Sequence, residues 1–244
     1  MNIGLFVPCY IDQFYPQVGI ASLRLLERLG CVVDYPLEQT CCGQPLANSG
    51  MEQDAKEIYH HFVDVFSDFD VVVVPSASCA LHVSHHYDVI PQTQAVKKLR
   101  KNTYDICSYL IDVLKVEKLD ARFPFRVGLH QSCHGLRGLR MAKSSELVSA
   151  PFSKWNMLLN MVEGIELINL TRPDECCGFG GTFSVTEEAV SVKMGKDRID
   201  DHLAHGAQYI TSGDMSCLMH LEGILRRNKS EVKVKHIVEI LNRV

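Results

Sequence analysis

The triplet Cys-Cys-Gly occurs twice in this sequence, in Thr40-Cys41-Cys42-Gly43 and again, 135 residues later, in Glu175-Cys176-Cys177-Gly178. Each triplet lies between two further cysteines, so the pattern C…CCG…C appears in two copies of four thiols each. The flanking cysteines are Cys9 and Cys79 in the first copy and Cys133 and Cys217 in the second. Such a repeated set of thiols indicates a shared chemical task in both halves of the chain.

The composition is that of an ordinary globular protein and excludes several functional classes. The chain has 244 residues, of which 46% are hydrophobic and 22% charged, with a formal net charge of −4. This charge and the lack of a basic stripe argue against nucleic-acid binding. No apolar run approaches the roughly 20 residues of a membrane span. The N-terminus lacks the basic and apolar regions of a signal peptide, so we expect a cytoplasmic protein.

Ten cysteines in a reducing compartment indicate metal or redox chemistry more than a disulfide framework. Cys31 and Cys107 lie in apolar segments and are typical of small buried side chains. That interpretation does not explain two Cys-Cys-Gly triplets, so the eight cysteines of the two copies are the candidate ligands.

Hydrophobic patterning predicts an α/β fold with two pseudo-repeated halves, residues 1–123 and 124–244. Each half is expected to be a small parallel sheet with crossover helices. The predicted strands are 2–7, 31–35, 70–74, 125–130, 166–170 and 208–211. The predicted helices are 16–29, 51–69, one beginning at 80, 91–100, 104–116, 135–161 (mostly helical, with an irregular stretch near Pro151), 185–203, 218–227 and 234–241. In parallel sheets ligands bind beyond the carboxyl ends of the strands, where the candidate cysteines fall.

Thiolates select zinc, copper(I) or iron–sulfur clusters, and four of them suit either tetrahedral zinc or a 4Fe–4S cluster. The spacing favours a cluster, because 31 residues separate Cys9 from Cys41 and 36 separate Cys42 from Cys79, whereas structural zinc sites use short knuckles. Adjacent cysteines also fit a cluster, which offers them separate irons. We interpret each copy as a 4Fe–4S site, with zinc as the alternative, especially after aerobic handling.

Other polar residues near the cysteines have weaker signals, and no catalytic residue is identified. His134 follows Cys133 and is either a proton carrier or a packed helix-start histidine. Arg137 and Arg140 have the chemistry to hold a substrate carboxylate, but surface arginines are the default. His82 and His86 share a helix face after Cys79, which we expect to be solvated.

The two copies resemble the CCG, or cysteine-rich, domain found in heterodisulfide reductase and its relatives. More narrowly, the chain resembles the lactate utilisation protein A family of iron–sulfur oxidoreductase subunits. The resemblance runs along the whole chain. It is carried by the strings Phe6-Val7-Pro8-Cys9-Tyr10, Gln39-Thr40-Cys41-Cys42-Gly43-Gln44-Pro45, Ser132-Cys133-His134-Gly135-Leu136-Arg137, Cys176-Cys177-Gly178-Phe179-Gly180-Gly181-Thr182-Phe183-Ser184 and Asp214-Met215-Ser216-Cys217-Leu218.

One position departs from the broader family, whose copies end in C-x-x-C. The first cysteine of that pair is Ser76 in the first copy and Asp214 in the second. Heterodisulfide reductase builds noncubane clusters on five cysteines per copy, so its cluster type and disulfide chemistry are not implied for a chain with four. Ordinary 4Fe–4S clusters, or one noncubane site with an oxygen ligand from Asp214, remain the alternatives.

The resemblance implies an electron-transfer subunit of a multi-subunit system that oxidises L-lactate, a small 2-hydroxy acid, to pyruvate. Larger relatives carry a ferredoxin-like C-x2-C-x2-C-x3-C-P segment, which this sequence lacks. The implied partners are therefore a ferredoxin-type iron–sulfur subunit and a third subunit of a lactate utilisation complex. A zinc-stabilised structural subunit and a thiol–disulfide reductase subunit of another 2-hydroxy acid pathway are the alternative functions.

Overall fold

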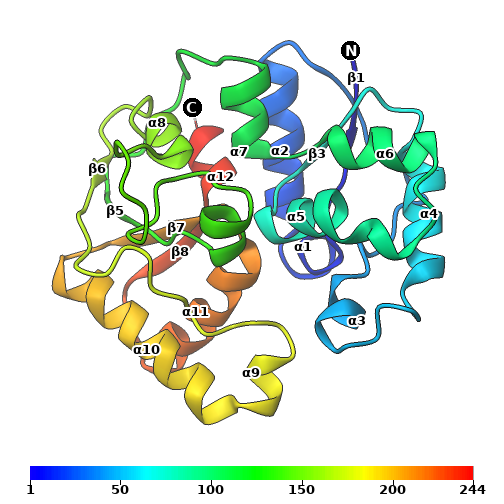
Figure 1. Ribbon diagram of the computed structural model, residues 1–244. Coiled ribbons are helices and arrows are strands. Elements are labelled where there is room, and N and C mark those ends of the chain that lie inside the picture. The colour runs from blue at the N-terminus through cyan, green and yellow to red at the C-terminus, as the bar shows by residue number, and fades with distance from the viewer. Residues whose placement is uncertain (244) are drawn as a thin grey trace. The chain divides into compact units, whose positions relative to one another are not determined.

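The computed structural model describes residues 1–243. The chain divides into two compact units, Met1–Leu114 and Lys115–Val244. Each unit contains one four-stranded sheet whose strands are all parallel, with helices between them (Figure 1). The predicted α/β fold with two repeated halves is confirmed. The repeat boundary at residues 123/124 stays a prediction.

The first unit has the strand order β2-β1-β3-β4. Its strands are β1 (Asn2–Leu5), β2 (Val32–Asp34), β3 (Val71–Val74) and β4 (Thr103–Asp105). Its helices are α1 (Cys9–Phe14), α2 (Pro16–Arg28), α3 (Gln44–Asn48), α4 (Lys56–Phe66), α5 (Ala77–His86), η1 (Tyr87–Val89), α6 (Gln94–Lys101), α7 (Ile106–Ser108) and η2 (Tyr109–Val113).

Helices cover both faces of the first sheet, with α4 and α6 on one side and α2 and α7 on the other (Figure 1). The four valines of β3 are all buried, as expected for a central parallel strand. On the α4 side, Phe6 packs edge-on against Phe62 and Phe66, at centroid distances of 4.8 and 5.7 Å. This aromatic cluster forms the centre of the core.

The second unit has the corresponding strand order β6-β5-β7-β8. Its strands are β5 (Arg126–Leu129), β6 (Glu166–Leu167), β7 (Tyr209–Ser212) and β8 (Lys233–His236). Its helices are η3 (His134–Gly138), α8 (Lys154–Leu159), α9 (Phe183–Thr186), α10 (Glu188–Ala204), α11 (Met215–Arg227) and α12 (Ile237–Leu241). Within residues 1–243, no helix combines the length and apolar character needed to cross a membrane.

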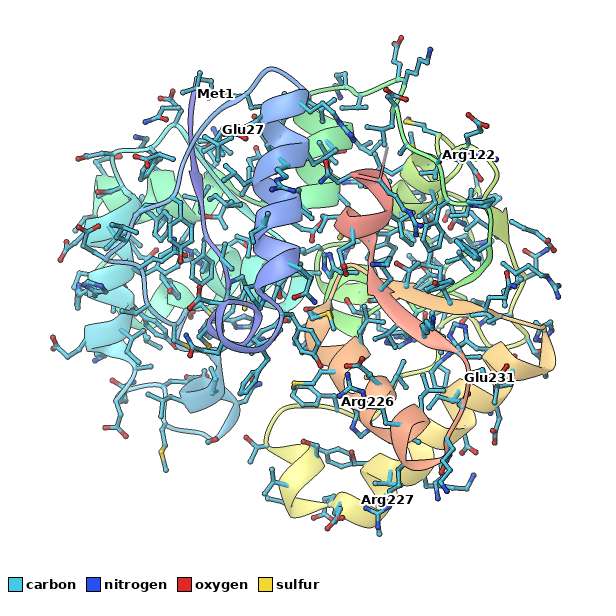
Figure 2. The ribbon with its side chains drawn as sticks, turned by 180° about the vertical axis from the view of Figure 1, so that it is seen from behind. Met1, Glu27, Arg122, Arg226, Arg227 and Glu231 are labelled. Carbon is cyan, nitrogen blue, oxygen red and sulfur yellow. The ribbon has the colours of Figure 1, made fainter. Side chains whose placement is uncertain are left out.

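The long helices α10 and α11 lie on one side of the second sheet, and α8 and α12 lie on the other (Figure 1). Helix α11 ends with Arg226 and Arg227, just before the turn that holds Glu231 and leads into β8 (Figure 2). Cations at this end suit the negative end of the helix dipole. The Arg226 Nη2 atom also donates to Glu222 Oε1 at 2.8 Å, one turn earlier in α11.

The fourth strand of each sheet was not predicted. Residues 104–116 were expected to be one helix, but residues 103–105 form β4 and pair with β3. The Asp105 carboxylate accepts hydrogen bonds from the amides of Cys107 and Ser108, at 2.8 and 3.2 Å, and so begins the helix at Ile106.

The first three residues of the expected helix 234–241 differ for the same reason, whereas residues 237–241 are helical as predicted. Residues 233–236 pair with β7, and the helix begins only at Ile237. The His236 side chain accepts from the Val238 amide, and the Glu239 carboxylate accepts from the His236 amide. This capping arrangement sets the first residue of the helix. The residues before it form β8 and pair with β7.

Residues 135–161 were expected to be mostly helical with an irregular stretch near Pro151, but they contain much less helix than predicted. After the short turn of η3, the chain is irregular until α8. Arg140 has a φ of 51°, which interrupts a helix, and Ala142 pairs with Ser153 in an isolated antiparallel bridge. Ser153 then begins α8, because its side chain accepts from the Asn156 amide at 3.2 Å.

We expect Phe62→Ala to destabilise the first unit by about 3–5 kcal/mol, because it empties a fully packed aromatic position. Urea unfolding followed by circular dichroism measures this loss, and fluorescence of the single tryptophan, Trp155, follows the second unit separately. Phe14→Ala is the matched control, since Phe14 is 70% exposed and should change stability by less than about 0.5 kcal/mol. Equal effects of the two substitutions would contradict the assigned core.

Candidate functional site

In the first unit the four predicted ligands lie at one edge of the sheet. Cys9 begins α1 directly after β1, and Cys79 lies in the first turn of α5, directly after β3. Cys41 and Cys42 lie in the loop between β2 and α3. Because β1, β2 and β3 are parallel, the segments that follow them meet at the same end of the sheet.

Side-chain hydrogen bonds pair Cys9 with Cys41, Cys41 with Cys42 and Cys42 with Cys79. Cys9 is exposed and Cys41 half-buried, whereas Cys42 and Cys79 are only 2% and 4% exposed. The structure therefore brings all four predicted residues together, and their role as metal ligands stays a prediction.

Gly43 is required by the turn beside these thiols. Its φ is +85°, and a Cβ atom at this position would lie 2.4 Å from Tyr59 Cε1. The close approach also directs the Gly43 amide to Cys41 Sγ, to which it donates at 3.3 Å. The glycine of the triplet thus gives both the turn and a backbone donor for sulfur.

The shared hydrogen bonds separate the pKa values of neighbouring thiols. Donation from Cys42 and Cys9, with a smaller effect of the Gly43 amide, lowers the pKa of Cys41 to about 3. The same contacts raise the pKa of Cys9 and Cys42, and burial adds to the rise. Cys41 is therefore the first thiolate of the set, and a thiolate is the form that binds metals.

Ser76, where the broader family has cysteine, caps α5. It is fully buried, and its Oγ accepts from the Cys79 amide at 3.4 Å and from the Tyr10 hydroxyl at 3.0 Å. Ser78 Oγ lies 3.1 Å from the same oxygen. The hydroxyl thus holds the helix start that carries Cys79, which accounts for a serine at this position.

The expectation of a solvated face for His82 and His86 is wrong for His82. His86 is exposed, but His82 is 3% exposed and its Nε2 lies 3.1 Å from the Tyr59 hydroxyl. Tyr59 stacks on Tyr87 at a centroid distance of 4.2 Å, and the Tyr87 hydroxyl donates to the Cys42 carbonyl at 2.9 Å. His82 therefore belongs to a buried aromatic layer beneath the Cys-Cys-Gly loop.

The second unit repeats the arrangement of thiols. Cys133 precedes η3 after β5, Cys176 and Cys177 lie in the loop before α9, and Cys217 lies in the first turn of α11 after β7. Hydrogen bonds link Cys133 to Cys176, Cys176 to Cys177 and Cys177 to Cys217. Cys177 is again the buried member, at 2% exposure.

Backbone amides also point at sulfur in this loop. The Gly178 amide donates to Cys176 Sγ at 3.4 Å, and the Phe179 amide donates to Cys177 Sγ at 3.5 Å. Donation from Cys133 and Cys177 lowers the pKa of Cys176 to about 2, so Cys176 corresponds to Cys41. Gly178 has a φ of +89°, and a Cβ there would lie 2.6 Å from the Ser191 carbonyl oxygen.

The second unit contains a buried histidine, His130, that the sequence analysis missed. Donor atoms of His130, Cys177 and Cys217 lie within 4.8 Å of one another. Burial, with a smaller effect of the Arg198 charge, lowers the pKa of His130 to about 3, so its imidazole is neutral. Alignment of the two copies contained the signal, because Val127-Gly128-Leu129 matches Ile3-Gly4-Leu5 and therefore sets His130 against Phe6.

Among the remaining polar candidates, Arg137 has structural partners. The Arg137 Nη2 atom donates to Glu146 Oε1 at 2.6 Å, and its Nη1 donates to the Asp174 carbonyl at 3.4 Å. Asp214 is fully buried as the N-cap residue of α11 and is not part of the three-donor cluster around His130. His134 is half-buried at the start of η3, and Arg140 is exposed.

The donor sets fit a thiolate-bound metal or iron–sulfur cluster. Each unit gathers four sulfurs, supplies backbone amides to them and holds one thiol with a strongly lowered pKa. Hydrogen bonds to sulfur and a buried setting are the features that stabilise and tune such groups. Cys31 and Cys107 lie outside both sets, and Cys107 is fully buried.

Comparison with known proteins identifies the same domain around each of the two thiol sets. A family model for the cysteine-rich domain, CCG, matches residues 3–84 and 127–222, which contain the two thiol sets. Among solved structures, a putative Asp/Glu racemase from Yersinia pestis matches 99% of this chain and 95% of its own. Its TM-score of 0.38 and identity of 13% are too low to indicate a shared fold.

Curated relatives match along the full length. Lactate utilization protein A of Macrococcus caseolyticus is 39% identical over 247 residues, covering 99% of this chain and 96% of the relative. The proteins of that name from Shouchella clausii and Geobacillus kaustophilus are 40% and 41% identical over 246 residues, with 99% of each chain covered. The chain therefore belongs to the CCG cysteine-rich domain family and to the lactate utilization protein A family.

Proposed function

We propose that each thiol set binds one 4Fe–4S cluster and that the chain is an electron-transfer subunit of an L-lactate oxidising system. One observation carries this proposal: eight cysteines from distant segments gather into two four-thiol sets with sulfur-directed amides. Four thiolates are the usual ligand set of a 4Fe–4S cluster, which accepts and releases single electrons when bound.

The residues of the chain have separate tasks in this proposal. Cys41 and Cys176, whose pKa values are lowest, are ready to bind metal at neutral pH. Cys42 and Cys177 are buried and hold the inner side of each centre away from water. Cys9 is exposed, which gives a partner protein an approach to the first centre.

The names of the relatives, which refer to lactate utilization, support lactate as the substrate of the proposed system. Oxidation of L-lactate to pyruvate releases two electrons and two protons, so the electrons need carriers such as two single-electron centres. We propose a ferredoxin-type iron–sulfur subunit and a third subunit of a lactate utilisation complex as partners. All ten cysteines are free thiols, which supports a cytoplasmic location.

Zinc is the second candidate, and a specific observation favours it in the second unit. Ligands of one zinc ion at roughly 2.0–2.3 Å lie about 3.5–4 Å from one another. His130, Cys177 and Cys217, whose donor atoms lie within 4.8 Å, are close to that arrangement. A zinc-stabilised structural subunit would follow. The paired thiols also leave a thiol–disulfide function as an alternative.

Anaerobically purified protein should contain about eight irons and eight sulfides per chain, as expected for two 4Fe–4S clusters. Cys42→Ser and Cys177→Ser should each leave about four irons, because each removes a buried ligand of one cluster. Metal and sulfide analysis measures these values, with Cys31→Ser as the control that keeps the full content. About two zinc ions and no sulfide would overturn the cluster proposal and favour zinc.

In metal-free protein, alkylation of Cys41 and Cys176 should be independent of pH between about pH 5 and pH 8, because lowered pKa values keep them thiolates throughout. The pKa of Cys31 is raised by burial, so its rate should rise about tenfold per pH unit. Mass spectrometry of iodoacetamide-treated protein gives each rate. A tenfold rise per unit at Cys41 or Cys176 would contradict the assigned thiolates.

With its partner subunits present, L-lactate should bleach the visible absorbance of the purified subunit, because electrons then reach its clusters. D-lactate is the matched control and should leave the spectrum unchanged. Cys42→Ser and Cys177→Ser should each lower lactate-dependent reduction of an artificial acceptor, whereas Cys31→Ser should not. Bleaching by L-lactate without any partner would show that this chain itself oxidises the substrate.

A further inference from the structure

His130 occupies the position in the second unit that Phe6 occupies in the first. The Phe6 amide donates to the Val73 carbonyl at 3.0 Å, and the His130 amide donates to the Thr211 carbonyl at 2.8 Å. The central strand pairs have the same register in both sheets. The two side chains therefore start from equivalent points of two similar frameworks, just before the first cysteine of each set.

The surroundings of these two positions differ in polarity. Phe6 packs edge-on against aromatic rings of α4, the nearer being Phe62 at 4.8 Å. His130 instead lies in the field of two basic side chains of α10, Arg198 and His202. The second unit has thus replaced an aromatic cluster by a polar one at the corresponding place.

A buried imidazole without partners needs an explanation. His130 is 0% exposed, and within residues 1–243 neither of its ring nitrogens has a hydrogen-bond partner. Leaving such a group unpaired costs stability, and Phe6 shows that the fold accepts an apolar ring at this position. Arg198 cannot supply an acceptor, because its guanidinium has only donors and binds Asp201 and the Arg172 carbonyl.

Two sulfurs of the second thiol set are close enough to the ring to belong to the same metal centre. The donor atoms of His130, Cys177 and Cys217 all lie within 4.8 Å of one another. They come from three segments that meet at the carboxyl end of the sheet, after β5, before α9 and at the start of α11. Imidazole nitrogen and thiolate sulfur are common joint ligands of zinc and occur together in some iron–sulfur centres.

We propose that His130 is a metal ligand of the second centre, beside Cys177 and Cys217. The second centre then has a mixed nitrogen–sulfur ligand set, and the first has sulfur alone. This inference rests on metal binding by the thiol sets, as proposed above. A neutral imidazole adds less negative charge than a thiolate, so the second centre should have the higher reduction potential and hold an electron more readily.

The test compares anaerobically purified full-length protein made with 14N-histidine and with 15N-histidine. Pulsed electron paramagnetic resonance of the reduced iron centres should show a directly bound nitrogen whose signal changes with the isotope. If metal analysis finds zinc, Co²⁺ exchanged into the sites gives the same measurement. This comparison uses the unmodified chain and does not depend on the folding of any variant.

Three variants identify which histidine supplies the bound nitrogen. His130→Phe installs the side chain of Phe6 and should abolish the coupling and lower the midpoint potential of one centre. His134→Gln and His220→Gln are the controls, because His134 adjoins Cys133 and His220 lies one turn after Cys217. Both controls should keep the coupling.

The outcomes separate this inference from the proposed function. Loss of the nitrogen coupling in His130→Phe alone supports His130 as the metal ligand. Coupling that persists in His130→Phe, or that disappears in either control, overturns the assignment. Iron clusters without any nitrogen coupling overturn it and leave the cluster proposal intact. Protein purified without iron or zinc would overturn both.

Discussion

Parallel pairing of β1 with β3 and of β5 with β7 is the constraint on which both thiol sets depend. In a parallel pair both strands end at the same end of the sheet. The residues that follow the two strands therefore lie close together without needing further contacts between distant segments. Cys9 and Cys79 meet in this way in the first unit, and Cys133 and Cys217 in the second. Each Cys-Cys-Gly loop turns back across the same end of the sheet, and the positive φ of its glycine permits this turn.

The two units share this framework but differ in what covers it. The first packs Phe6 on the aromatic rings of α4 and places a tyrosine layer beneath its loop. The second sets His130 among basic groups of α10 at the matching place. Because burial and charge around a metal centre tune its potential, similar thiol sets need not have similar redox properties. The repeat thus fixes where the thiols lie and leaves their surroundings free to differ.

Two errors of sequence-based prediction fall on short edge strands and on the capped helix starts that follow them. Residues 104–105 and 234–236 were expected to be helical, because a strand of three or four residues gives too little periodicity to tell it from a helix. Pairing with β3 and β7 decides their conformation, and Asp105 and His236 then begin the helices. The burial of His82 was missed as well, since it depends on contact with Tyr59, 23 residues away in the sequence.

The sequence by itself determined the α/β class, the two repeated halves and the eight cysteines that gather at the strand ends. These follow from local patterns, namely apolar runs, helix signals and a repeated triplet, which need no knowledge of distant contacts. Tertiary structure alone decided which thiol becomes the thiolate, that Ser76 caps α5, and that His130 lies unpaired beside Cys177 and Cys217. Each of these depends on burial and on hydrogen bonds between segments far apart in the chain, and burial and contact exist only once the sheet has formed.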